Sequence, residues 1–104
     1  MPSPASSDLN AFLERNDSRI MEELFEFLRI PSVSAKSTHN ADTARAAEWT
    51  RDSLEKAGLK AVIHPTPGHP IVLGEWRGAP GAATVLVYGH YDVQPAEPLE
   101  LWTS

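Results

Sequence analysis

A histidine and an aspartate two residues apart, His90 and Asp92, directly follow the most apolar stretch of the sequence, residues 82–88. A neutral imidazole is a good zinc ligand, and a metal-binding histidine usually donates its second ring N–H to a carboxylate that fixes its tautomer and orientation. Residues i and i+2 of an extended backbone project to the same side, so we expect the Asp92 carboxylate to reach the His90 ring. The pair predicts one metal ligand and its orienting carboxylate.

The same pair has a second interpretation that needs no metal. His-x-Asp patterns are common by chance, and one histidine with one aspartate does not complete a metal site. In this interpretation His90 bonds to the backbone at the end of a strand, while Asp92 and the following Gln94-Pro95 form a turn. Taken alone, the pair favours this structural role, so its surroundings must decide.

The remaining histidines do not extend the candidate site. His39, His64 and His69 fall in an expected loop, strand and turn, and isolated histidines usually serve packing or face solvent. If the pair binds metal, the candidate site in this chain is limited to His90 as the metal ligand and Asp92 as the catalytic carboxylate.

Two helical segments precede the pair. Apolar residues recur at helical spacing over residues 8–28, in one helix or in two with a break near Asn16. Pro31 ends this segment, because the residue before a proline is pushed out of the helical region. A second helix is predicted over about residues 40–57, with Gly58 as the left-handed residue after its end.

Three strands follow the helices. Leu59–His64 and Ile71–Trp76 are predicted strands separated by a turn rich in proline and glycine. Ala83–Tyr88 is β-branched and almost continuously apolar, as in a central strand covered on both faces. The fold class is therefore α/β with an incomplete sheet. The pair would lie at the carboxyl end of the third strand, where ligands bind in open α/β sheets.

Composition narrows the classes of function. The chain has 104 residues, a net charge of −5 and no cysteine, so we expect no nucleic-acid partner and no thiolate metal site. No apolar run approaches the roughly 20 residues of a membrane helix, and the polar start is unlike a signal peptide, so a cytoplasmic protein without membrane contact is predicted. Residues 1–7 are expected to form a disordered tail, and residues 8–104 one domain.

The segment Tyr88–Ala96, followed by Pro98 and Trp102, resembles the first metal-binding signature of the dinuclear zinc exopeptidases. That family includes carnosinases, cytosolic nonspecific dipeptidases, aminoacylases, acetylornithine deacetylase and succinyl-diaminopimelate desuccinylase. The continuation Asp-Val-Gln-Pro is most similar to the dipeptidase branch. Further segments resemble the family in the family's order, at residues 27–34, 54–58 and 68–72.

The resemblance implies a function. His90 would be a ligand of one of two zinc ions, Asp92 would orient it, and a water activated by both metals would hydrolyse dipeptides or acylated amino acids. Manganese or cobalt would also suit nitrogen and oxygen ligands. The family's general base and remaining ligands would lie beyond Ser104, so we expect an N-terminal fragment of the catalytic domain that is inactive alone. A homodimer is implied only for the full-length enzyme.

A function of another class stays open at this point. The chain could be a non-catalytic α/β interaction or structural domain derived from such an enzyme. The zinc content and affinity of the 104-residue chain would separate the two hypotheses in part. Tight stoichiometric zinc is not expected, because His90 and an orienting Asp92 leave two or more coordination positions unfilled.

Overall fold

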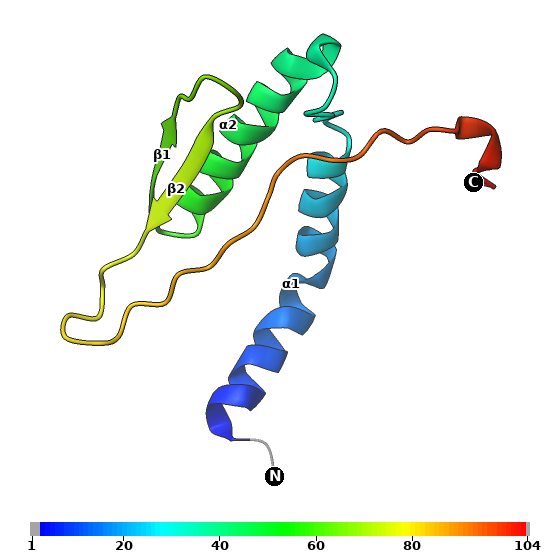
Figure 1. Cartoon of the computed structure of the whole chain (residues 1–104). Helices are drawn as coiled ribbons and strands as arrows, with labels where there is room; N and C mark the ends of the chain where they lie inside the picture. The colour runs from blue at the N-terminus through cyan, green and yellow to red at the C-terminus, as the bar shows by residue number, and fades with distance from the viewer. Residues whose placement is uncertain (1–2, 104) are drawn as a thin grey trace.

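The computed structural model describes residues 3–103, and its packed part is a helix on a two-stranded sheet (Figure 1). The helices are α1 (Pro4–Leu28) and α2 (Asn40–Lys56), the strands are β1 (Lys60–His64) and β2 (Ile71–Glu75), and short 3-10 helices span Ser37–His39 and Leu99–Leu101. The Cα radius of gyration is 17.2 Å, whereas a compact chain of 100 residues has about 13 Å. Much of the chain therefore lies outside the packed layer.

The first helix is longer than the sequence predicts. The Ser3 hydroxyl accepts a hydrogen bond from the Ser6 backbone N–H at 3.2 Å, which caps the helix start. Residues 4–7, assigned to the disordered tail 1–7 by their composition, are thus helical, and Met1 and Pro2 lie outside the described residues. The helix is continuous at Asn16, whose side-chain amide donates to the Phe12 carbonyl at 2.8 Å.

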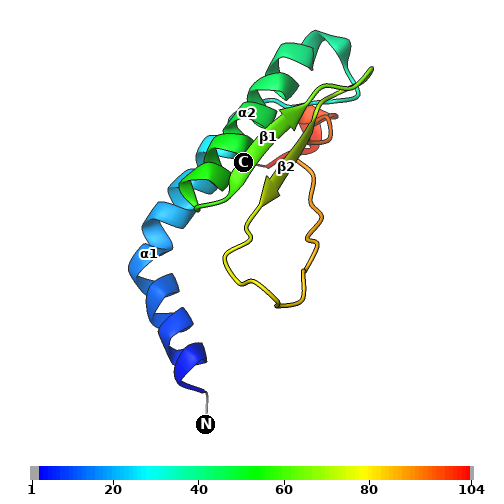
Figure 2. The ribbon, with the colours of Figure 1, turned by 90° about the vertical axis from the view of Figure 1, so that its left-hand side faces the viewer.

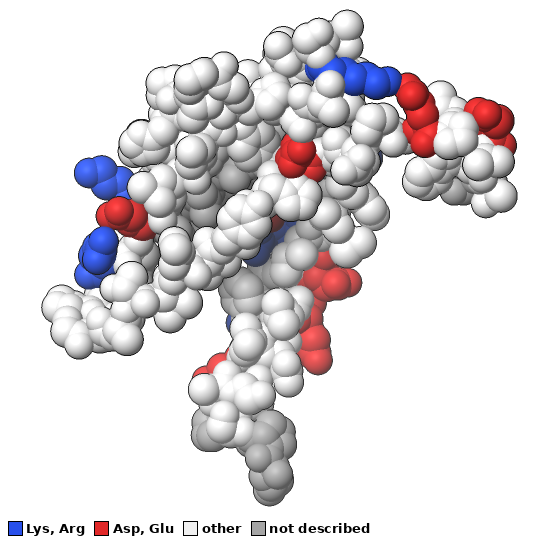
Figure 3. All heavy atoms as spheres, viewed as in Figure 1, with Lys and Arg blue, Asp and Glu red and all other residues white. Residues whose placement is uncertain are grey.

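The apolar stripe of α1 is half exposed, and the helix projects from the packed layer (Figure 2). Its attached end is held near α2 by Phe27, whose ring stacks on Trp49 with 4.8 Å between ring centroids. Acidic side chains gather along α1, and the basic ones are scattered over the visible face (Figure 3). The helix ends before Pro31, as predicted.

The second helix and the sheet form the core through small side chains. Ala46 and Ala47 on α2 are fully buried, and a Cβ atom added to Gly74 of β2 would lie 3.0 Å from a methyl of Leu54. Helix and sheet therefore approach closely. Gly58 follows the helix with a positive φ of 95°, and its N–H bonds to the Glu55 carbonyl, which confirms the predicted left-handed helix end.

Within residues 3–103 the sheet has two strands, and the predicted third strand is not confirmed. β1 and β2 pair antiparallel, with Val62 opposite Leu73, close to the predicted positions. Residues 82–88 run extended without a strand partner, and Leu86 and Tyr88 are 89% and 88% exposed. An apolar β-branched stretch forms a ladder only where another strand offers its N–H and C=O groups, and no described segment does so here. The α/β class is confirmed, but the sheet is smaller than predicted.

Candidate metal site

His90 and Asp92 lie side by side at the end of the extended segment, as the spacing predicts. The His90 Nδ1 atom is 2.9 Å from Oδ1 of Asp92 and 3.2 Å from the Asp92 carbonyl oxygen. Both partners accept hydrogen bonds, so Nδ1 carries a proton, and in the neutral form of the ring Nε2 has the lone pair. The His90 side chain is 71% exposed. Its Nε2 atom is therefore chemically and sterically free to bind a ligand.

The loop after α1 holds this segment in place. The Ser32 hydroxyl donates to the Tyr91 carbonyl at 3.0 Å, and the Val93 N–H donates to the Ser32 carbonyl at 3.0 Å. Ser32 is 1% exposed, so both bonds are shielded from water. The extended segment is thus fixed next to the histidine, although it has no strand partner further upstream.

A second serine of the same loop contacts the carboxylate itself. The Ser34 hydroxyl donates to Oδ2 of Asp92 at 2.5 Å. The hydrogen bond from Ser34 lowers the pKa of the Asp92 carboxyl below its ordinary value; partial burial opposes this shift, and the bond to His90 adds to the lowering. Asp92 is therefore an anion near neutral pH, which is the state that accepts from both neighbours.

Two residues of the β1–β2 hairpin region complete the surroundings. The Tyr91 hydroxyl donates to the Pro70 carbonyl at 2.5 Å, and burial together with the charge of Asp92 raises the pKa of Tyr91. The neighbouring His69 places its Nε2 atom 2.9 Å from the Ser34 carbonyl. Three segments, from the loop after α1, the hairpin and the extended stretch, thus meet at the His90 and Asp92 pair.

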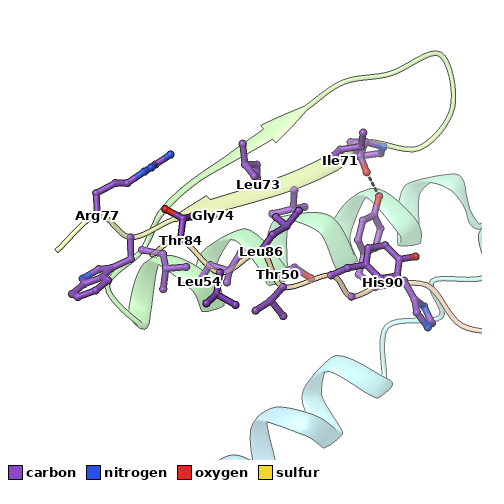
Figure 4. A pocket seen from close by; sticks show the side chains of 18 of the residues that line it. Thr50, Leu54, Ile71, Leu73, Gly74, Arg77, Thr84, Leu86 and His90 are labelled. Atoms are coloured by element: carbon purple, nitrogen blue, oxygen red, sulfur yellow. Dashed lines mark hydrogen bonds between the residues drawn. The ribbon is translucent and has the colours of Figure 1, made fainter. Parts of the chain in front are cut away.

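An open apolar groove of about 1390 Å³ leads up to the pair. Thr50 and Leu54 of α2, Gly74 of β2 and Leu86 of the extended segment surround the hollow, and His90 lies at one end (Figure 4). The extended residues 82–88 themselves line one side of the groove. Polar side chains lie at both ends of the groove, with Arg77 at the end opposite His90 (Figure 4).

The donor set fits one metal ligand and its support. A neutral imidazole with Nδ1–H bonded to a carboxylate and Nε2 free is the arrangement of a zinc-binding histidine. Within residues 3–103, however, no three His, Asp or Glu side chains come together to hold a metal. His39 instead bonds Asp42 at 2.8 Å, and His64 lies on an exposed strand position. A complete site would need ligands from outside the described chain.

Ser34 is the site residue that the sequence reasoning missed. It lies 58 positions before Asp92, and no spacing rule connects a loop serine with such a distant carboxylate. The available signal was its membership of the segment Phe27–Ser34, which resembles the zinc exopeptidases alongside the histidine motif. That signal placed the segment in a family without giving the serine a contact.

The chain is similar to curated dipeptidases along most of its length. It is 34% identical to the cysteinylglycine-S-conjugate dipeptidase of Corynebacterium striatum over 96% of this chain and 22% of that protein. It is 33% identical to a Cys-Gly metallodipeptidase of Candida albicans over 88% and 22%, and 28% identical to one of Saccharomyces cerevisiae over 95% and 24%. The chain thus spans about a fifth of the length of the relatives it matches. No protein-family model and no solved structure matches it.

Proposed function

We propose that this chain, a relative of the metallodipeptidases, is the part of a metal-dependent dipeptidase that supplies a histidine ligand and the carboxylate that orients it. The observation that supports the proposal is the 2.9 Å contact between His90 Nδ1 and Asp92 Oδ1, which leaves Nε2 free. The dipeptide substrate class comes from the relatives, whose names specify Cys-Gly or cysteinylglycine conjugates.

His90 would hold one of two zinc ions through Nε2, and manganese or cobalt would suit the same donors. Metal ions at such a site lower the pKa of a water molecule and polarise the scissile carbonyl. The chain's own contribution is orientation: Asp92 keeps the proton on Nδ1 and the ring fixed, and the loop bonds through Ser32 keep the pair at the mouth of the groove. These residues set geometry before substrate arrives.

The chain alone would be inactive, because one histidine leaves most coordination positions unfilled. Residues 8–104 would form part of a larger catalytic domain. The structure shows no helix within residues 3–103 that is long and apolar enough to cross a membrane. A cytoplasmic location, the absence of a nucleic-acid partner and a homodimer of the complete enzyme stay predictions.

The test is metal-dependent hydrolysis by the longest natural protein that carries this chain. We expect cleavage of Cys-Gly and related dipeptides, loss of activity with a chelator, and recovery with zinc or manganese. The 104-residue chain should be inactive in the same assay. Full activity after exhaustive chelation would contradict the proposal. Cleavage of no peptide by the metal-loaded protein would instead favour the alternative of a non-enzymatic α/β domain.

A further inference from the structure

The two oxygens of the Asp92 carboxylate have different partners. Oδ1 accepts from His90 Nδ1 at 2.9 Å, and Oδ2 accepts from the Ser34 hydroxyl at 2.5 Å. The carboxylate therefore bridges the proposed ligand and a loop that is remote in sequence. Each partner uses a separate oxygen, so the two bonds do not compete.

Packing alone does not hold the pair. The side chains of His90 and Asp92 are 71% and 40% exposed, and the terminal torsion of an aspartate is broad and roughly two-fold. With only the histidine as partner, the carboxylate plane could turn and offer its oxygens to water. A donor on Oδ2 restricts that rotation and keeps Oδ1 directed at the imidazole.

Ser34 is itself held on two sides. Its carbonyl oxygen lies 2.9 Å from His69 Nε2, which donates to it, and the nearby Ser32 is buried and bonded to Tyr91 and Val93. The hydroxyl therefore starts from a fixed backbone position. A serine in a free loop would gain little by the same contact, because it would first lose its own conformational freedom.

We propose that Ser34 is a positioning residue of the metal site, whose hydroxyl fixes the Asp92 carboxylate so that His90 keeps its proton on Nδ1 and presents Nε2. This inference rests on the proposed function, because the tautomer has a role only if His90 binds a metal through Nε2. The hydrogen bonds among these side chains form in the chain without metal. Their effect on the His90 tautomer can therefore be measured without catalysis. His69 holds the Ser34 carbonyl, and the Ser34 hydroxyl and His90 Nδ1 each donate to one oxygen of Asp92.

The experiment measures the His90 ring tautomer by nitrogen chemical shifts in the 104-residue chain, in alkaline solution where imidazoles are neutral. The decisive variants are Ser34→Thr and Ser34→Val, which have the same shape and differ in the hydroxyl. In the threonine variant, we expect the ratio of Nδ1–H to Nε2–H to stay within about twofold of that in the unmodified chain. In the valine variant, the same ratio should fall about fivefold. Ser34→Ala should fall like valine, and Ser37→Ala should change nothing.

Equal ratios in the threonine and valine variants, or an unchanged ratio in Ser34→Ala, would overturn the role of Ser34. Asp92→Ala, which removes both side-chain acceptors, distinguishes that failure from a failure of the proposed function. If Asp92→Ala shifts the tautomer and the serine variants do not, only the role of Ser34 is wrong. If Asp92→Ala also leaves the tautomer unchanged, the orienting role on which the proposed site depends is wrong as well.

Discussion

Apolar residues of similar type are packed in one part of the molecule and exposed to solvent in another. Ile63 and Val72 pair in the β1–β2 ladder and are half-buried, on the sheet face that α2 covers. Val85 and Leu86 of the extended segment are instead 81% and 89% exposed. The hairpin has both a strand partner and a covering helix, and the extended segment has neither. The comparison shows that the His90 and Asp92 pair is held by the loop after α1 rather than by the extended segment that precedes it.

The largest contrast is expected from changes in the packed layer. Ala47→Leu should destabilise the chain by about 1 to 3 kcal/mol, because Ala47 is fully buried where α2 meets the sheet and no room exists for a longer side chain. Leu86→Ser should change the free energy of unfolding by less than about 0.5 kcal/mol, because Leu86 is exposed. Urea unfolding followed by circular dichroism measures both. A loss from Leu86→Ser as large as that from Ala47→Leu would show that the extended segment packs in solution.

A medium effect should separate the anchored end of the extended segment from its free part. Ser32→Ala removes the donor to the Tyr91 carbonyl. The contact between residues 91–93 and the loop after α1 should become less stable by about 1 kcal/mol. Hydrogen exchange at the Val93 N–H, which bonds to the Ser32 carbonyl, should then accelerate about fivefold.

The ladder amides of β1 and β2 serve as the internal control and should exchange at unchanged rates. The Leu86 amide should exchange rapidly in both proteins, because it has no partner in the structure. Slow exchange at Leu86 before the mutation would mean that a partner strand forms in solution. The extended segment would then not differ from the hairpin in strand pairing.

The smallest expected effect concerns the start of α2. Hydrogen bonds from His39 and Arg45 lower the pKa of Asp42 below its ordinary 3.8. Its contribution to stability is therefore complete above that ordinary value and lost as the pH falls through the lowered one. The urea midpoint should decline more between about pH 5 and pH 3 in the unmodified chain than in Asp42→Asn. A constant difference between the two proteins over this range would show that the contacts do not matter.

The sequence predicted the local elements well, because their signals are local. Pro31 and Gly58 bound the two helices through backbone geometry, and the alternation after Gly58 placed β1 and β2 almost to the residue. His90 and Asp92 were brought together as expected, since two residues of extended chain suffice for their contact.

The errors arose where structure depends on distant partners. The segment Ala83–Tyr88 has the composition of a central strand, but composition does not supply the neighbouring strand that would pair with it. Ser34 was missed for the related reason that its contact with Asp92 closes a long loop in the chain. Residues 4–7 were assigned to a tail because their polar composition outweighed the capping by Ser3, which is a single hydrogen bond.

The central claim is that His90 is a metal ligand and that Asp92 orients it. The most direct measurement is zinc affinity by chelator competition in the longest natural protein that carries this chain, for His90→Ala, Asp92→Ala and the exposed strand control His64→Ala. We predict loss of zinc at one site with His90→Ala, about 10- to 100-fold weaker binding with Asp92→Ala, and unchanged binding with His64→Ala. Zinc binding by His90→Ala with unmodified stoichiometry and affinity would contradict the account.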